Sequence, residues 1–460
     1  MVQIDFNKPV RTHFIGIGGI SMSGLALVLV QRGFSVSGSD MKRSELTEKL
    51  EAAGIPVAIG QRAENITDDI DVAVYTAAVH AGNPEFDEAV RRGIPMLSRA
   101  ELLGQIMDCY PVSIAVAGTH GKTTTTSMVA EILMAGGLDP TISLGGMLDS
   151  IGGNLRLGNS DIFLAEACEY TNSFHNFYPD IAVILNIRED HLDFFKNLEN
   201  IRASFARFMR NIPDDGLLIL DSGIDNYQEL TTGLSCRLCV VGRRPEDDYS
   251  AADITFNEKG CGSFTVLEKA TGETWPIRLS VPGIHNVENA LAAIAAGRDR
   301  GLAWEVIAGG LEHFCGTHRR FEHKGNLGNI SIIDDYAHHP DEIEATLATA
   351  RACKPERVIC IFQPHTYTRT KRLFEQFAKQ LAKADVVVLA DIYAAREADN
   401  LGVSSKQLAD RIAELGTEAH YFPSFDEILN FLLEKSMNGD MLITMGAGDI
   451  DIVADKLLGK

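Results

Sequence analysis

A glycine-rich segment that also carries a lysine and threonines is the strongest chemical signal in the sequence. Residues 118–124 read Gly-Thr-His-Gly-Lys-Thr-Thr and lie between an apolar run typical of a strand and a pattern typical of a helix. The glycines allow backbone N–H groups to face phosphate oxygens, Lys122 adds a positive charge, and the Thr123 hydroxyl can reach Mg²⁺. We therefore predict an ATP-binding loop, although Val116 stands where the general pattern has its first glycine. The predicted ATP-binding residues in this segment are Gly118, Thr119, His120, Gly121, Lys122, Thr123 and Thr124.

Acidic side chains and a histidine follow two further apolar runs and are candidate metal ligands. The run at 161–166 leads to Glu169, and the run at 181–186 leads to Asp190 and His191. Carboxyl ends of neighbouring strands in an open α/β sheet lie at the same edge, so these side chains can converge on the phosphate loop. Spacing alone does not decide which carboxylates bind a metal, because each one could also be a solvated loop acid or a helix cap.

A second glycine-rich turn lies near the N-terminus. Residues 16–24 read Gly-Ile-Gly-Gly-Ile-Ser-Met-Ser-Gly, and Asp40 ends the next strand-like run. The segment is similar to a dinucleotide-binding fingerprint, but Ser21 replaces its third glycine, and a purely structural turn is an alternative. A pyrophosphate at a helix N-terminus is needed by UDP as much as by NAD. The triphosphate loop argues against NAD, because a hydride-transfer enzyme has no use for a triphosphate site.

Composition and charge exclude several classes of protein. The chain has 460 residues and a formal net charge of −21, which argues against a protein that coats nucleic acid. Hydrophobic residues make up 45% and charged residues 23%, values typical of a globular protein. No apolar stretch is long enough to cross a bilayer, and the first residues lack the apolar core of a signal peptide. We expect a cytoplasmic protein that binds neither nucleic acid nor membrane, with its 8 scattered cysteines mostly buried as free thiols.

The order of strand-like and helix-like runs predicts a parallel α/β architecture in three parts. A strand, a glycine turn and a helix follow one another at 13–31 and again at 112–134, and a third α/β part begins near Phe321. Between them, residues 247–281 alternate apolar and polar side chains and predict antiparallel strands, hence a mixed sheet. The predicted domains are residues 1–108, 109–320 and 321–460, and the third has predicted helices at 340–352 and 371–384.

Six motifs in this order resemble the Mur ligase family of peptidoglycan synthesis. They are residues 118–124, 166–169, 186–193, 282–290, 317–322 and 334–340. The resemblance extends from Thr12 to Asp449. Within the family, the segments at 13–20, 334–340, 363–370 and 446–450 are similar to those of the members that add the first amino acid of the peptide stem.

The resemblance implies both an architecture and a reaction. The architecture is an N-terminal Rossmann-like domain for UDP, a central P-loop ATPase domain with a mixed sheet, and a C-terminal Rossmann-like domain for the amino acid. The reaction is ATP-dependent ligation of L-alanine to the carboxylate of UDP-N-acetylmuramate through an acyl phosphate, with Mg²⁺. It serves cell wall biogenesis and hence cell shape and cell division. We expect a monomer or a homodimer.

The resemblance also assigns residues to the ligands. It places Asn286 and Asn289 at the adenine, Asp335 at the ribose, and Arg320 at the phosphates of ATP. The implied metal ligands are Thr123, Glu169 and His191, and the implied catalytic residues are Lys122, Arg320 and His338. The implied UDP-sugar site consists of Gly16, Gly18, Gly19, Asp40, Thr76, His80, Ser98 and Arg99. The implied amino-acid site consists of Tyr336, His338, His365 and Arg369.

Two departures from the family pattern and several alternatives accompany this assignment. Thr366 stands where some members carry an arginine, and residues 203–207 contain no lysine where several relatives have a carbamylated one. His338 could accept the amine proton or stabilise the tetrahedral intermediate. Alternative functions are a sibling ligase that attaches a preformed peptide, an NAD-dependent oxidoreductase, and a nucleotide-regulated binding module. The sequence does not separate L-alanine from glycine or serine.

Overall fold

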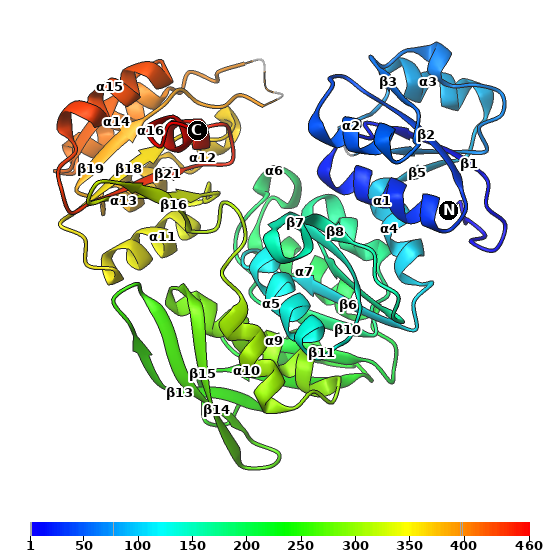
Figure 1. Cartoon of the computed structure of the whole chain (residues 1–460), viewed down its shortest axis with the longest axis horizontal. Helices are drawn as coiled ribbons and strands as arrows, with labels where there is room; N and C mark the ends of the chain where they lie inside the picture. Colours follow the sequence, from blue (N-terminus) through cyan, green and yellow to red (C-terminus); the bar gives the residue numbers. More distant parts are fainter. Residues whose placement is uncertain (1, 77, 396, 398) are drawn as a thin grey trace. The chain divides into compact units, whose positions relative to one another are not determined.

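The computed structural model of the protein describes residues 2–76, 78–395, 397 and 399–460 (Figure 1). Two compact units make up the chain. The first consists of Met1–Ser250 and Leu291–Gly310, and the second of Ala251–Ala290 and Leu311–Lys460. Strands and helices alternate along both, which confirms the predicted α/β class.

The N-terminal part of the first unit is a parallel sheet of 5 strands in the order β3-β2-β1-β4-β5. Its strands are β1 (Arg11–Ile15), β2 (Ser35–Asp40), β3 (Val57–Ile59), β4 (Val72–Tyr75) and β5 (Met96–Ser98). Its helices are α1 (Ile20–Gln31), α2 (Glu45–Ala52), α3 (Pro84–Arg92) and α4 (Arg99–Met107). Local signals set the ends of α3: the Asn83 side chain caps its first turn, and Gly93 ends it with a φ of 68°.

The larger sheet of the first unit has the order β12-β11-β10-β6-β9-β7-β8. Its strands are β6 (Val112–Ala117), β7 (Thr141–Leu148), β8 (Gly153–Arg156), β9 (Ile162–Glu166), β10 (Ile181–Ile184), β11 (Leu217–Asp221) and β12 (Arg237–Gly242). Its helices are α5 (Lys122–Ala135), α6 (Leu192–Phe195), α7 (Leu198–Met209) and α8 (Tyr227–Thr231). The central strands β9, β6 and β10 run parallel and are buried along most of their length, as expected for a sheet covered on both faces.

An antiparallel segment and two helices follow in sequence. The strands are β13 (Tyr249–Phe256), β14 (Cys261–Glu268) and β15 (Glu273–Pro282), and the helices are α9 (Ile284–Asp299) and α10 (Trp304–His313). β14 and β15 pair antiparallel, and alternate residues of β14 are buried. This confirms the antiparallel strands predicted from the alternating pattern.

The C-terminal sheet has 6 strands in the order β16-β17-β21-β18-β19-β20. They are β16 (Glu322–Leu327), β17 (Ile330–Asp335), β18 (Arg357–Phe362), β19 (Val386–Leu389), β20 (Glu418–Tyr421) and β21 (Asp440–Met445). Val358, Cys360 and Phe362 pack into one apolar cluster, and Ile359 and Ile361 pack into another. Because successive side chains of a strand point to opposite faces, the two clusters cover the two faces of the sheet, as expected for a Rossmann-like domain.

The C-terminal helices divide between these two clusters. The first cluster contains side chains of α11 (Pro340–Ala352), α13 (Phe374–Leu381) and α14 (Ser405–Glu414). The second contains side chains of α15 (Phe425–Lys435) and α16 (Asp451–Leu457). The helix predicted at 371–384 is instead two helices, α12 (Tyr367–Arg372) and α13, because Leu373 has non-helical angles between them.

Within the described ranges, no helix combines the length and the apolarity needed to span a membrane.

The cysteines differ from the prediction in their burial. All 8 cysteines are free, but only Cys261 and Cys360 are buried, so the prediction that most are buried is wrong. Several lie at element ends, where backbone leaves the core: Cys109 and Cys315 follow α4 and α10, and both are exposed.

Neighbouring glycines in α10 give a test of the packing in the first unit. An added Cβ at Gly309 meets nothing within 4 Å, whereas one at Gly310 would lie 2.8 Å from the Cα atom of Ile132. We expect Gly309→Ala to raise the free energy of unfolding by about 0.5–1 kcal/mol, because alanine restricts the unfolded chain. We expect Gly310→Ala to lower it by about 1–3 kcal/mol through overpacking. Urea unfolding of both variants measures the two values, and equal effects would contradict this packing.

Candidate active site

The phosphate loop occupies the turn between β6 and α5. Gly121 is the N-cap of α5 with a φ of 85°, and Gly118 has a φ of 147°, angles that strongly favour glycine. A Cβ added at Gly118 would also lie 3.0 Å from the Cβ atom of Leu185. The turn therefore directs the start of α5, with its unpaired N–H groups and positive dipole end, toward the sheet edge.

Asn186, in the segment that follows β10, holds this loop through hydrogen bonds and was not among the predicted site residues. Its Oδ1 atom accepts a hydrogen bond from the His120 N–H at 2.8 Å, and its Nδ2 atom donates one to the His120 carbonyl at 3.0 Å. Its own carbonyl accepts from the Thr119 N–H at 3.1 Å. The Thr119 hydroxyl in turn accepts from the Arg188 N–H at 2.9 Å. The only feature of the sequence that pointed to Asn186 was its position in the Asn-Ile-Arg-Glu motif.

Lys122 begins α5 and folds back over the loop. Its Nζ atom donates to the carbonyls of Gly118 and Thr119 at 2.7 and 3.1 Å. It also lies 2.9 and 3.2 Å from the two carboxylate oxygens of Glu169, a residue that is 2% exposed. Burial acts against the charged ammonium, but the Glu169 carboxylate outweighs it and raises the pKa of Lys122 above its ordinary value. Lys122 is therefore a fixed positive charge beside the loop.

Two of the three predicted metal ligands lie together at this edge. The Nε2 atom of His191 is 3.8 Å from a Glu169 carboxylate oxygen and 3.7 Å from one of Asp190. The His191 ring also packs on Tyr170, with 4.4 Å between ring centroids. Thr123 follows Lys122 at the start of α5 and is buried. The donor set of carboxylate, hydroxyl and imidazole is compatible with Mg²⁺, for which the oxygens are the preferred ligands.

The N-terminal glycine loop connects β1 to α1 and is held by the end of β2. The N–H groups of Gly16 and Ile17 both donate to the Ser39 carbonyl at 2.9 Å. The Gly18 N–H donates to the Asp40 carboxylate, also at 2.9 Å. Asp40 therefore holds the loop itself through one oxygen atom.

The other predicted UDP-sugar residues lie at three places in the first unit. Thr76 follows β4, and its Cγ2 atom would be 2.9 Å from a Cβ added at Gly16. Ser98 caps α4 through a hydrogen bond from the Glu101 N–H, and the guanidinium of the half-buried Arg99 donates to the Ser21 hydroxyl at 3.0 Å. Burial lowers the pKa of Arg99. The structure thus brings Thr76 and Arg99 to the glycine loop, gives Ser98 a capping role, and leaves His80 exposed.

Asp335 ends β17 in the second unit and is a buried acceptor. Its carboxylate accepts hydrogen bonds from the Ala337 N–H at 2.7 Å, the Phe321 N–H at 3.0 Å and the Thr346 hydroxyl at 3.1 Å. Burial raises its pKa to about 6, while the Arg320 guanidinium acts in the opposite direction. Asp335 thus fixes the loop after β17, with its hydrogen-bonding capacity largely used by the protein.

Arg320 and the two asparagines are the other ATP candidates of the second unit. The Arg320 guanidinium lies 5.3 Å from the Tyr336 ring centroid and 4.0 Å from the Glu342 carboxylate. Asn286 and Asn289 lie on the first turns of α9 and are buried. Asn286 donates to the Pro282 carbonyl at 2.7 Å and accepts from Asn289 at 3.0 Å.

The predicted amino-acid residues cluster at the carboxyl ends of β17 and β18. The His338 ring approaches the His365 ring to 6.1 Å between centroids, and His365 stacks on Tyr393 at 5.5 Å. Burial lowers the pKa of His365 to about 4, and electrostatic interaction with His338 and Arg369 adds to this effect. The structure therefore brings His338, His365 and Arg369 together and keeps His365 neutral at pH 7. Tyr336 joins them through its carbonyl, which lies 2.9 Å from the Nδ1 atom of His338.

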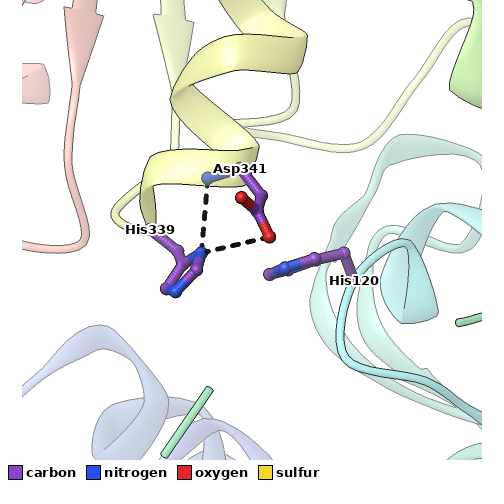
Figure 2. A group of neighbouring side chains, drawn as sticks. All are labelled: His120, His339 and Asp341. Carbon is purple, nitrogen blue, oxygen red and sulfur yellow. Dashed lines mark hydrogen bonds and ion pairs between the residues drawn. The ribbon is translucent and has the colours of Figure 1, made fainter. Parts of the chain in front are cut away.

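His339, next to His338, serves the helix. Its Nδ1 atom accepts a hydrogen bond from the Asp341 N–H at 3.3 Å, and the Asp341 carboxylate lies 3.9 Å from the same atom (Figure 2). Its own N–H donates to the Glu342 carboxylate at 3.2 Å, which completes a capping box at the start of α11.

Comparison with known proteins decides the family. The family model "Mur ligase family, catalytic domain" matches residues 11–110, "Mur ligase middle domain" matches 116–297, and "Mur ligase, glutamate ligase domain" matches 319–448. The chain belongs to the Mur ligase family.

Relatives of known name or structure match along the whole chain. The UDP-N-acetylmuramate–L-alanine ligase of Agathobacter rectalis is 55% identical over 460 residues, which is 100% of both chains. The protein of the same name from Lachnoclostridium phytofermentans is 50% identical over 470 aligned positions, again 100% of both. The crystal structure of UDP-N-acetylmuramate-alanine ligase from Thermotoga maritima has a TM-score of 0.82 and 32% identity, covering 98% of each chain. That of a murein peptide ligase from Psychrobacter arcticus has a TM-score of 0.74 and 26% identity, with the same coverage.

The titration of His365 tests the charge arrangement in this Mur ligase. We expect His365 to titrate near pH 4, because burial and its cationic neighbours disfavour the imidazolium. Arg369→Ala removes one of those cations, so the pKa should rise but stay below 6.5, since burial is the largest cause. Carbon-13 NMR of histidine-labelled protein measures both values, with the signal assigned through His365→Gln and with Arg372→Ala as the control. An unshifted pKa in Arg369→Ala would contradict the arrangement.

Proposed function

We propose that this protein joins L-alanine to the carboxylate of UDP-N-acetylmuramate, with ATP converted to ADP and phosphate. The names of full-length relatives at 50–55% identity support the substrates. The observation that carries the ATP-dependent step is the phosphate loop, with the half-buried Lys122 held between loop carbonyls and the buried Glu169. The product would serve peptidoglycan synthesis.

The chemistry requires that the carboxylate be activated first. A free carboxylate resists attack by an amine, because the leaving group would be oxide. Transfer of the γ-phosphoryl group of ATP to the carboxylate oxygen gives an acyl phosphate and ADP. The alanine amine then attacks the carbonyl carbon, and the tetrahedral intermediate expels phosphate and forms the amide bond. Lys122 and Arg320 would neutralise charge on the transferring group.

The amine must lose a proton as it attacks, and His338 is the proposed residue for this step. Its Nδ1 atom lies 2.9 Å from the Tyr336 carbonyl, so Nδ1 would carry the hydrogen and Nε2 would be the basic atom. In this orientation Nε2 can accept the amine proton or, once protonated, stabilise the oxyanion. We propose the first role, because a neutral amine is the nucleophile.

We propose Thr123, Glu169 and His191 as the residues that hold Mg²⁺. Glu169 lies beside both Lys122 and His191, so its carboxylate oxygens would be available to the ion next to the lysine charge. When bound, the ion would offset negative charge on the β- and γ-phosphate oxygens. Asn286, Asn289 and Asp335 are proposed for the nucleoside, together with the loop residues Gly118 to Thr124.

The amino-acid site is proposed around Arg369. Its guanidinium would bind the alanine carboxylate through two parallel hydrogen bonds. Neutral His365 would border the site without adding charge, and Tyr336 and His338 would complete it. Thr366 has a role of its own, because its hydroxyl accepts from the Arg369 N–H at 3.4 Å and caps the helix that carries Arg369.

We further propose a division of labour among three domains. Residues 1–108 would bind the UDP-sugar, 109–320 ATP, and 321–460 the amino acid, and the ranges of the three family models support these boundaries. The UDP pyrophosphate would lie on the loop of Gly16, Gly18 and Gly19, with Asp40, Thr76, His80, Ser98 and Arg99 around it. We propose a cytoplasmic location and a monomer or homodimer.

A phosphate-release assay tests the proposed function. The protein is incubated with ATP, Mg²⁺ and UDP-N-acetylmuramate, and L-alanine, glycine, L-serine and an L-alanine-headed tripeptide are added in separate reactions. We expect release with L-alanine, weaker release with glycine and serine because one methyl group gives about 1–3 kcal/mol of discrimination, and none with the tripeptide. Release with the tripeptide alone would show a sibling ligase. No turnover but tight nucleotide binding would show a binding module.

Replacement of Lys122 tests the ATP step. We expect Lys122→Ala to lower kcat by about a hundredfold or more, because a preorganised charge at the transferring group is lost. Lys122→Arg should restore only part of the rate, since the loop and Glu169 are shaped around an ammonium. Lys379→Ala, an exposed lysine of α13, is the control with normal turnover. Near-normal turnover of a folded Lys122→Ala protein would contradict the assignment of the loop.

Replacement of Arg369 tests the amino-acid site. We expect Arg369→Ala to raise KM for L-alanine about tenfold to a hundredfold, because a charge-assisted contact to a carboxylate contributes about 1.5–3 kcal/mol. The KM for ATP should remain unchanged. Arg369→Lys should recover part of the loss, and Arg372→Ala serves as the control. Equal changes in both KM values would move Arg369 to the phosphate site and the carboxylate contact to Arg372.

A further inference from the structure

A buried carboxylate of α3 contacts side chains of β1 and β2 in the N-terminal sheet and is outside every site described above. Glu85, in the first turn of α3, is 0% exposed. Its Oε2 atom accepts a hydrogen bond from the Ser39 hydroxyl at 2.5 Å and lies 3.7 Å from the Nε2 atom of His13. Its Oε1 atom accepts from the Asn65 side chain and, at 3.3 Å, from the Arg62 N–H. Elements separated in sequence therefore meet on one carboxylate.

The carboxylate is held in its charged form. Burial opposes the charge, but the nearby His13 imidazole and the hydrogen bonds from Ser39 and Asn65 outweigh it and lower the pKa of Glu85 below its ordinary value. A buried, ionised carboxylate with this many donors is costly to assemble, and its loss leaves several polar groups without an acceptor. Its partners are thus fixed in position relative to α3.

Ser39, one of these partners, also holds the glycine loop in place. Ser39 contributes its hydroxyl to Glu85, and its carbonyl accepts from the N–H groups of Gly16 and Ile17 at 2.9 Å. The next residue, Asp40, accepts from the Gly18 N–H at 2.9 Å. The end of β2 therefore connects Glu85 on one side to the loop on the other, and it sets the direction of the loop N–H groups.

We propose that Glu85 is a positioning residue for the UDP-sugar, acting through Ser39 and Asp40 on the glycine loop. This inference rests on the proposed binding of the UDP pyrophosphate at that loop. Glu85 does not touch the substrate. It fixes the backbone donors that would meet the phosphate oxygens, and a pyrophosphate site depends on such donors being held in advance.

The experiment compares variants of the full chain. Glu85→Gln keeps the size of the side chain and removes its charge, and Ser39→Ala removes the connecting hydroxyl alone. Ile66→Ala is the control, because Ile66 is a fully buried residue of the small apolar cluster beside α3 and has no part in the Glu85 contacts. Steady-state kinetics give KM for each substrate and kcat, calorimetry gives the Kd of UDP-N-acetylmuramate, and thermal unfolding gives the loss of stability.

We expect Glu85→Gln to raise the Kd and the KM for UDP-N-acetylmuramate about tenfold, the effect of roughly one displaced charge-assisted hydrogen bond. The KM for ATP and L-alanine should remain within about twofold of the wild type. Ser39→Ala should show the same selective change to a smaller degree, and the double variant should not exceed Glu85→Gln. Ile66→Ala should lose stability without a selective change in KM.

Three results separate the inference from the proposed function. Wild-type protein that binds NADH and not the UDP-sugar would contradict the proposed function itself. Wild-type protein that binds the UDP-sugar, with Glu85→Gln and Ser39→Ala binding equally well, would overturn the role of Glu85. If Glu85→Gln does not fold, Ser39→Ala provides the test, because it removes one hydroxyl and leaves the carboxylate with its other donors. An unchanged Kd for UDP-N-acetylmuramate in Ser39→Ala would then overturn the inference.

Discussion

The half-buried lysine ammonium at the start of α5 requires a nearby carboxylate, and the first unit supplies one in the buried Glu169. Lys122 follows β6, Glu169 follows β9, and Asn186, which holds the loop through hydrogen bonds, follows β10. These strands are neighbours in one parallel sheet, so their carboxyl ends meet without any long-range distortion of the backbone. The apolar centres of the strands stabilise the sheet, and their ends carry the chemistry.

The ends of strands in the other two sheets also carry side chains that hold neighbouring loops. A side chain at the end of one strand accepts hydrogen bonds from the backbone of a neighbouring loop: Asp40 from Gly18, and Asp335 from Phe321 and Ala337. The Arg319 side chain is a donor instead of an acceptor: its guanidinium donates hydrogen bonds to the carbonyls of Gly446 and Gly448, which follow β21. Residues that resemble ligand contacts in the sequence therefore also hold the loops that ligands would meet. Substitution of such residues would change the loop backbone as well as any direct contact to a ligand.

Much of this arrangement could be predicted from the sequence, because its signals are local. Helix α11 begins at Pro340 and ends at Ala352 as predicted, since a proline and a capping residue mark its start. The break at Leu373 was missed, because the amphipathic pattern continues through it. Asn186 and Glu85 were also missed, since their partners lie 66 and 46 residues away in sequence and only the fold brings them together.

We propose that this loop directs the γ-phosphoryl group of ATP to a carboxylate before the amide bond forms. Transfer of an isotope from that carboxylate to phosphate is a direct test of this order of steps. UDP-N-acetylmuramate labelled with ¹⁸O in its carboxylate is converted with ATP and L-alanine, and the released phosphate is analysed by mass spectrometry. We expect each phosphate to carry one ¹⁸O atom taken from the carboxylate. Unlabelled phosphate, released together with the ligated product, would contradict it.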